Sequence, residues 1–192
     1  MDDLTPELAA LGRKIHIRGT AGKTTLARAI SEKTGIPYVG LDAIRHQPNW
    51  VEMPDEQFLE TVTAKLDSME SWIADGNYTT ALGPAVVERA DSVIVIHFKW
   101  RTMFWRLLKR TVRRSLFREE LWNGNRESWR LSFFHRQSLL WFHIKTRKRH
   151  DARLNRFKDW LKPGTNVTEL LSSDELDDFY RRNSLVRRYV KG

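Results

Sequence analysis

An apolar run, a glycine-containing turn and a helical run follow one another near the start of the chain, and this order restricts the fold more than any other feature. Residues 14–17 (Lys-Ile-His-Ile) predict a buried strand, and residues 26–30 (Leu-Ala-Arg-Ala-Ile) predict a helix. Between them lies Arg-Gly-Thr-Ala-Gly-Lys-Thr-Thr, residues 18–25. Such a turn arranges successive backbone N–H groups and a helix N-terminus around a phosphate. The sequence therefore predicts a phosphate-binding loop in an α/β fold.

The turn departs from the regular phosphate loop, which has Gly, four residues and then Gly-Lys-Thr. Counting back from Gly22, the first Gly would fall at position 17, where the chain has Ile. Either Ile17 replaces that Gly, or the strand extends through Ile17 and the loop begins at Gly19, two residues short. The alternation of Ile15 and Ile17 favours the second interpretation. A shorter loop offers fewer amides, so we expect weakened nucleotide affinity.

Within this loop the residue types indicate specific roles. Lys23 is expected to reach the terminal phosphates of a nucleotide, and the Thr24 hydroxyl is expected to be a Mg²⁺ ligand. The expected nucleotide-binding residues are Gly19, Thr20, Ala21, Gly22, Lys23, Thr24 and Thr25.

Composition limits the classes of protein that the chain can belong to. At 192 residues and 41% apolar, we expect one domain over 1–192, with a helical lid inserted at about 100–160. The chain has no Cys, which excludes disulfides and thiolate metal sites. An acidic start without a signal-peptide core, and no apolar run of membrane-spanning length, predict a cytoplasmic protein without a membrane partner. The oligomeric state stays open.

Strand and helix patterns alternate along the chain. Strands are predicted at 13–18, 38–41, 71–74, 92–96 and 166–170, and helices at 6–11, 23–34, 55–69, 83–89, 100–117, 135–150 and from Ser172 to about Arg182. Gly35 is expected to cap the second helix, and Ser172 with Glu175 forms a capping-box pattern. Five strands separated by helices predict a doubly wound five-stranded parallel sheet.

The positive charge is concentrated in one segment. Residues 101–150 hold fourteen Lys and Arg against three Glu, a balance of +11, so the rest of the chain balances to −2 within the net +9. Trp100, Trp105, Trp122, Trp129 and Trp141 lie in or beside it. Such a block is suited to nucleic acid, an acidic membrane surface or small phosphorylated ligands, or it is a solvated helical surface over buried Trp.

Residues that follow the predicted strands are candidates for chemistry, because ligands of such sheets gather at the carboxyl ends of the strands. Asp42 follows the second strand and Asp75 the third. Each carboxylate can accept a proton from an attacking hydroxyl or hold Mg²⁺ through water, although Asp is also common in turns and caps.

Arginines suit phosphoryl transfer because their planar fork holds phosphate oxygens bidentately. Arg106, Arg110 and Arg113, spaced on one predicted helix face, are the main lid candidates, together with Arg114. Arg118, Arg126 and Arg136 are weaker candidates. His16 and His46 show no metal-binding spacing and are left structural or unassigned.

Over residues 13 to 180 the chain resembles the adenylate-kinase-related P-loop kinases, specifically the group known as DNA topology modulation proteins. The phosphate loop, residues 41–43 with 48–50, residues 72–78 (Trp-Ile-Ala-Asp-Gly-Asn-Tyr), residues 104–110 and residues 121–128 carry the resemblance. It implies a nucleoside-monophosphate-kinase-like fold with an arginine-rich lid, and ATP and Mg²⁺ as ligands. It leaves the acceptor undefined, so the partner is a small phosphate- or hydroxyl-bearing substrate.

Two departures from this family concern the same site. The phosphate loop is short, and His97 follows the fourth strand where members commonly carry Asp. The expected function is an ATP-dependent small-molecule or nucleotide kinase, in which Lys23 holds phosphates, Asp42 and Asp75 face the acceptor, and the lid arginines close over the transferred group. The alternatives are a catalytically weak nucleotide-binding protein whose 101–150 segment binds nucleic acid, and a nucleotide-gated interaction protein.

Overall fold

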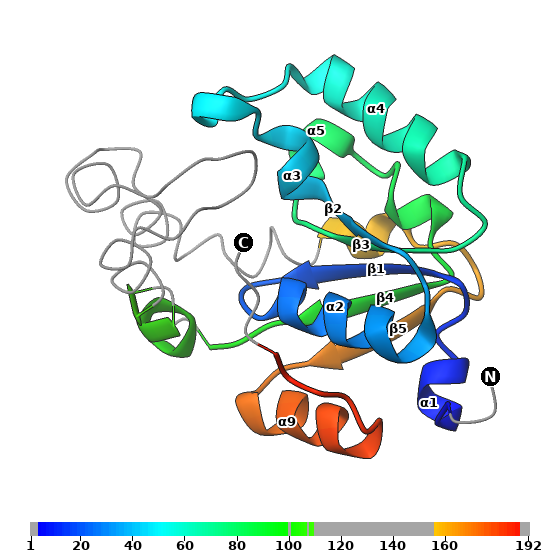
Figure 1. Ribbon diagram of the computed structural model, residues 1–192, viewed down its shortest axis with the longest axis vertical. Helices are drawn as coiled ribbons and strands as arrows, with labels where there is room; N and C mark the ends of the chain where they lie inside the picture. Colours follow the sequence, from blue (N-terminus) through cyan, green and yellow to red (C-terminus); the bar gives the residue numbers. More distant parts are fainter. Residues whose placement is uncertain (1–3, 100, 107, 110–155, 189–192) are drawn as a thin grey trace.

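A parallel sheet forms the centre of the molecule (Figure 1). The computed structural model describes residues 4–99, 101–106, 108–109 and 156–188. Its strands are β1 (Lys14–Gly19), β2 (Tyr38–Gly40), β3 (Trp72–Asp75), β4 (Ser92–Ile96) and β5 (Asn166–Leu170). They are hydrogen-bonded in the order β2-β3-β1-β4-β5, and every pair is parallel. The predicted doubly wound five-stranded sheet is therefore confirmed.

Helices cover both faces of this sheet (Figure 1). The α-helices are α1 (Pro6–Ala9), α2 (Lys23–Thr34), α3 (Leu41–Arg45), α4 (Asp55–Asp67), α5 (Thr79–Leu82) and α9 (Ser173–Arg182). Short 3₁₀ helices are η1 (Pro48–Trp50), η2 (Val87–Arg89) and η6 (Arg156–Trp160). One apolar cluster joins the sheet to α1, α2 and α9, and a second joins its other face to α4, α5, η2 and η6.

The helix caps follow the sequence closely. Gly35 ends α2 in the left-handed region with φ 75°, and its N–H donates to the Ser31 carbonyl. At the start of α9 the Ser172 hydroxyl accepts a hydrogen bond from the Glu175 N–H at 3.1 Å. Glu175 reaches back to the N–H of Leu171 at 2.8 Å, so both predicted caps are confirmed.

Two local predictions need correction. The segment 83–89 is not one helix: α5 ends at Leu82, and η2 begins at Val87. Gly83 has φ 50° and ψ −132°, outside the helical region, and Pro84 lacks the N–H that a continuing helix needs. The second strand ends at Gly40, one residue earlier than predicted, and Leu41 begins α3. Asp42 thus lies in the first turn of a helix.

The basic segment is largely outside the described residues. Residues 101–106 and 108–109 are helical, as predicted for 100–117, whereas the predicted turn at 122–125 and helix at 135–150 lie outside that part. The lid therefore stays a prediction. Among the described helices, none has the length and apolar character needed to cross a membrane.

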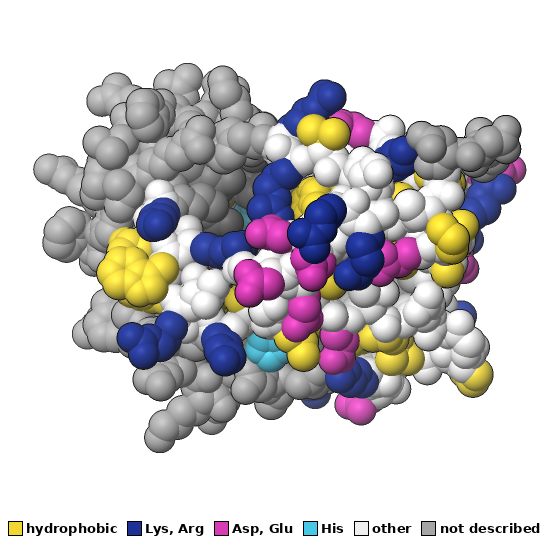
Figure 2. All heavy atoms as spheres, turned by 90° about the horizontal axis from the view of Figure 1, so that it is seen from below, with side chains coloured by type: hydrophobic (Ala, Val, Ile, Leu, Met, Phe, Trp, Pro, Cys, Tyr) yellow, Lys and Arg dark blue, Asp and Glu magenta, His cyan; other side chains and the backbone are white. Residues whose placement is uncertain are grey.

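The face that carries α9 has side chains of both signs interleaved (Figure 2). Ion pairs join Arg187 to Asp177 and Arg181 to Asp178, each at 2.5 Å, and Arg182 to Glu7 at 3.1 Å. These pairs are exposed and contribute little to stability individually. This face is not a uniformly basic surface.

Candidate functional site

The predicted phosphate loop is short because β1 continues through the position where a regular loop would begin. Ile17 is fully buried inside β1, where it pairs with Ile94 of β4 and Asp75 of β3. The strand ends at Gly19, and α2 begins at Lys23, so residues 20–22 alone connect them. The structure confirms the part of the second interpretation in which the strand extends through Ile17.

The first two loop amides are already bonded within the protein. The Gly19 N–H donates to Asn77 Oδ1 at 2.8 Å, and the Asn77 amide donates back to the Gly19 carbonyl at 2.5 Å. The Thr20 N–H donates to the Ile96 carbonyl at 2.7 Å. Gly19 itself is required here, since its φ is 129° and an added Cβ would stand 2.0 Å from the Ile96 oxygen. The loop start is therefore fixed between β3 and β4.

The amides that follow are free to bind an anion. In the described part of the chain, the backbone N–H groups from Ala21 to Thr25 have no hydrogen-bond acceptor. They surround the N-terminus of the twelve-residue helix α2, whose dipole favours negative charge. Lys23 begins this helix and forms no ion pair with any described carboxylate. This arrangement is compatible with the phosphate binding that the sequence predicts.

Thr24 and Asp75 meet at the carboxyl end of β3. The Thr24 hydroxyl donates to Asp75 Oδ2 at 2.5 Å, and the Tyr38 hydroxyl donates to the same oxygen at 3.3 Å. Asp75 Oδ1 is buried without a hydrogen-bond partner. Burial raises the pKa of the Asp75 carboxyl, while the nearby Lys23 and the Thr24 hydrogen bond act in the opposite direction.

These oxygens fit the ligand preferences of Mg²⁺. A hydroxyl and a carboxylate are hard oxygen ligands, and the unpartnered Asp75 Oδ1 is a buried acceptor that a cation would satisfy. Across the described residues, no cluster of three or more His, Cys, Asp or Glu side chains is arranged to hold a metal. Magnesium at this site would therefore depend on Thr24, Asp75, phosphate oxygens and water.

Asp42 belongs to a second polar cluster on the α3 side. The Tyr78 hydroxyl donates to Asp42 Oδ1 at 2.6 Å and lies 3.3 Å from His46 Nε2. Burial and the Asp42 charge raise the pKa of Tyr78, which keeps the phenol protonated as a donor. Phe58 packs edge-on against the Tyr78 ring at 4.9 Å between centroids. Asp42 also lies near enough to Asp75 for its charge to help raise the pKa of the Asp75 carboxyl.

Among the expected lid arginines, Arg106 is the one that the structure describes. Its guanidinium donates to the Ser173 hydroxyl at 2.9 Å and lies over the Phe98 ring, 4.5 Å from the centroid. Burial lowers its pKa. Arg106 is therefore held at the start of α9 rather than beside Asp42 or Asp75. Arg110, Arg113, Arg114, Arg118, Arg126 and Arg136 lie outside the described residues.

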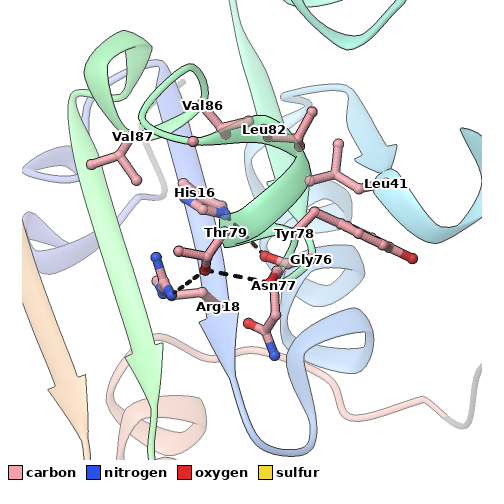
Figure 3. A pocket seen from close by; sticks show the side chains of 11 residues that line it. His16, Arg18, Leu41, Gly76, Asn77, Tyr78, Thr79, Leu82, Val86 and Val87 are labelled. Carbon is pink, nitrogen blue, oxygen red and sulfur yellow. Dashed lines mark hydrogen bonds between the residues drawn. The ribbon is translucent and has the colours of Figure 1, made fainter. Parts of the chain in front are cut away.

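Sequence reasoning did not assign three residues that the structure places around this site. Asn77 brackets Gly19, while His16 and Arg18 point from β1 toward residues 76–79 (Figure 3). The signal for His16 and Arg18 was available, since alternate residues of a strand share one face. Two polar residues on one face of a strand that is otherwise apolar indicate a polar site beneath it.

Comparison with known proteins gives a limited result. The chain matches no protein-family model and no curated protein. It is similar to the unliganded crystal structure of a sugar kinase from Janibacter sp., with 17% identity and a TM-score of 0.48, over 88% of this chain and 92% of that one. A likeness of this degree concerns the arrangement of the chain and carries no argument about its activity.

Proposed function

We propose that the protein is an ATP-dependent phosphotransferase, a kinase that acts on a small acceptor. The contact between Thr24 and Asp75, beside the free amides of residues 21–25, is the observation that carries the proposal. It brings a phosphate-binding helix terminus, a lysine and two hard oxygen ligands to one place. A structural role alone would not require a buried carboxylate with an unpartnered oxygen.

Each residue of this site has a defined part in the reaction. Lys23 and the amides of residues 21–25 bind the β- and γ-phosphates, which places the transferred group at the sheet edge. Thr24 and Asp75 hold Mg²⁺, which supplies neutralisation of the phosphate charge when it is bound. Asp42, supported by the Tyr78 hydroxyl, lies toward the acceptor side and can accept its proton. Asp75 was expected to face the acceptor, and its contact with Thr24 favours the metal role instead.

This assignment also bears on His97. A carboxylate after the fourth strand is unnecessary for Mg²⁺ if Asp75, at the end of β3 on the other side of β1, provides the oxygen. His97 is then weaker evidence against catalysis than the sequence suggests. The short loop remains evidence against efficient catalysis, because the Gly19 and Thr20 N–H groups already donate to Asn77 and Ile96.

A phosphotransfer screen tests the proposal. The chain is incubated with ATP and Mg²⁺ over nucleoside monophosphates, nucleosides, sugars and small hydroxy acids. Lys23→Ala should lower turnover about 10²–10³-fold, because a charge is lost that stabilises the developing phosphate charge. Lys65→Ala, an exposed lysine on α4, is the matched control and should retain full turnover. Equal turnover in Lys23→Ala and Lys65→Ala would contradict this mechanism.

Nucleotide binding tests the site independently of the acceptor. Calorimetry with ATP should give a dissociation constant above the micromolar range, and Mg²⁺ should tighten it. Asp75→Asn retains an acceptor for the Thr24 hydroxyl but loses the charge, so Mg²⁺ should no longer tighten binding. Micromolar ATP affinity would contradict the weakened loop, and an unchanged Mg²⁺ effect in Asp75→Asn would contradict the metal role.

A further inference from the structure

Arg18 is a buried cation without a carboxylate partner. Its side chain projects from β1 into the layer beneath α5 and is 2% exposed. One terminal nitrogen donates to the Thr79 hydroxyl at 3.2 Å, and the guanidinium lies over the Phe157 ring at 4.4 Å. Arg18 Nε is buried and unpartnered, and no carboxylate of the described residues lies within ion-pairing distance. A buried charge is costly unless an opposite charge compensates it.

The ring contact and the single hydroxyl do not satisfy this side chain. A guanidinium carries five N–H donors, and the Thr79 bond uses one of them. Burial lowers the pKa of Arg18 to about 10, which leaves it charged at neutral pH. Nε is the donor that is left buried without an acceptor among the described residues.

A small cavity adjoins Arg18 (Figure 3). Its volume is about 10 Å³, and its walls come from His16 and Arg18 of β1, residues 76–79, and the apolar side chains of Leu41, Leu82, Val86 and Val87. A cavity of this size accepts one water-sized atom and excludes a whole phosphate group. The apolar walls lower the local dielectric and strengthen the attraction of Arg18 for a negative charge.

His16 does not supply that charge. Its Nε2 lies 3.1 Å from the Gly76 carbonyl, which can only accept, so Nε2 carries the hydrogen and Nδ1 is a lone-pair acceptor. Burial and the nearby Arg18 charge keep the ring neutral. Because His16 is neutral, Arg18 is the one positively charged residue among those that line the cavity.

We propose that Arg18 and Thr79 form a binding site for one anionic atom, which is a halide ion or a single oxygen of a carboxylate or phosphate. The atom would bind between the free guanidinium donors and the cavity, with the Thr79 hydroxyl fixing the orientation of Arg18. The cavity volume sets the limit of one atom.

Two residues that line the cavity also contact the proposed active site. The Tyr78 hydroxyl donates to Asp42 on the acceptor side, and Asn77 accepts a hydrogen bond from the Gly19 N–H. The anion therefore has two sources with the same chemistry: a free ion, or a negatively charged group of the acceptor itself. The second source rests on the proposed function, whereas the site as such does not.

Anion titrations of the full chain test the site. Thermal unfolding is followed in a buffer whose anion is a bulky sulfonate, with chloride, formate or inorganic phosphate added. Near one hundred times its dissociation constant, a bound anion should raise Tm in a saturable manner by about 5–10 °C. Arg18→Met should lose this saturable rise. Arg13→Met removes an exposed charge at the other end of β1 and should retain it. Equal saturable responses in all three proteins, or none in wild type, would overturn the proposal.

A second variant keeps the proposal testable if Arg18→Met does not fold. Thr79→Val preserves the shape but removes the hydroxyl that orients Arg18, and it should weaken chloride binding severalfold. Chloride binding is then measured by broadening of the chloride nuclear resonance, which formate should reverse. Unchanged broadening in Thr79→Val, or no broadening in wild type, counts against the site.

Paired acceptors separate the two sources. Phosphotransfer is compared for glycerol and glycerate, and for a nucleoside and its monophosphate. A loss of kcat/KM of tenfold or more in Arg18→Met that is confined to the charged member assigns the anion to the acceptor. Equal effects on both members assign it to a free ion. Absence of phosphotransfer, with the anion response intact, refutes the proposed function and leaves the anion site standing.

Discussion

Strand β1 is buried on both faces, yet the two faces differ in what they meet. Ile15 and Ile17 are fully buried in the apolar cluster with α2 and α9. His16 and Arg18, 5% and 2% exposed, lie on the other face, and each keeps a buried nitrogen without a partner. All four side chains are buried to a similar degree, but only His16 and Arg18 carry polar atoms that lack a hydrogen-bond partner.

The difference separates the part of the strand that stabilises the fold from the part that is shaped for a ligand. Burial of an apolar side chain stabilises the folded protein by itself. Burial of a polar group without a partner destabilises it. Perturbed polar groups of this kind cluster at functional sites. The polar face of β1 points toward residues 76–79, the same loop that meets the phosphate loop through Asn77 and Asp42 through Tyr78.

The largest expected effect concerns the apolar face. Ile17→Ala removes fully buried methyl groups at the centre of the sheet, so it should lower the free energy of unfolding by about 2–5 kcal/mol in urea denaturation. Ile15→Ala should behave similarly. A cost below about 1 kcal/mol, the range of a tolerated hydrophobic exchange, would show that this face is not the stabilising one.

The polar face should give a pH dependence that the apolar face cannot. Burial, together with the Arg18 charge, lowers the pKa of His16 from 6.5 to about 3. The unfolded chain therefore binds a proton at this histidine below pH 6.5, while the folded protein does not. Above pH 6.5, His16 therefore leaves the free energy of unfolding nearly unchanged. As the pH falls toward 3 this histidine lowers it, by about 2 kcal/mol between pH 6.5 and 5.

His16→Gln tests this assignment. The variant keeps an N–H donor for the Gly76 carbonyl but does not titrate, so its free energy of unfolding should fall less between pH 6.5 and 5. Denaturant unfolding at both pH values measures the difference. The same decline in wild type and His16→Gln would show that other groups cause it.

The sequence predicts most of the fold because the elements are defined by local patterns. The apolar run 92–96 and the segment 166–170 coincide with β4 and β5, and residues 23–34 coincide with α2. The predicted helix at 83–89 is wrong because Gly83 and Pro84 are turn residues, which end α5 at Leu82. Local composition thus fixes the type of each element better than its ends.

The site was predicted in part because contacts between strands depend on their order. Lys23 and Thr24 follow from a local motif, and Asp42 and Asp75 from their positions after strands. The pairing of Asp75 with Thr24 requires β3 to lie beside β1, a long-range fact that no motif encodes. Arg18 was predicted at the end of the first strand and the start of the loop, and neither pattern shows that its side chain is buried.

The smallest expected effect lies where the polar face meets the phosphate loop. Asn77→Ala leaves the Gly19 N–H and carbonyl without the Asn77 amide, which should cost about 1–2 kcal/mol of stability. Because Gly19 begins the loop, the amides of residues 21–25 should also lose their fixed direction, and ATP affinity should fall by about tenfold, equivalent to about 1.4 kcal/mol.

A matched variant distinguishes the two bonds of Asn77. Asn77→Asp keeps the acceptor for the Gly19 N–H but loses the donor to the Gly19 carbonyl, and it places a negative charge near the phosphates. It should therefore be closer to wild type in the urea midpoint than Asn77→Ala, yet bind ATP more weakly in calorimetry. If Asn77→Ala binds ATP as wild type does, the contact serves only the fold. The functional part of the polar face would then be confined to His16, Arg18 and their cavity.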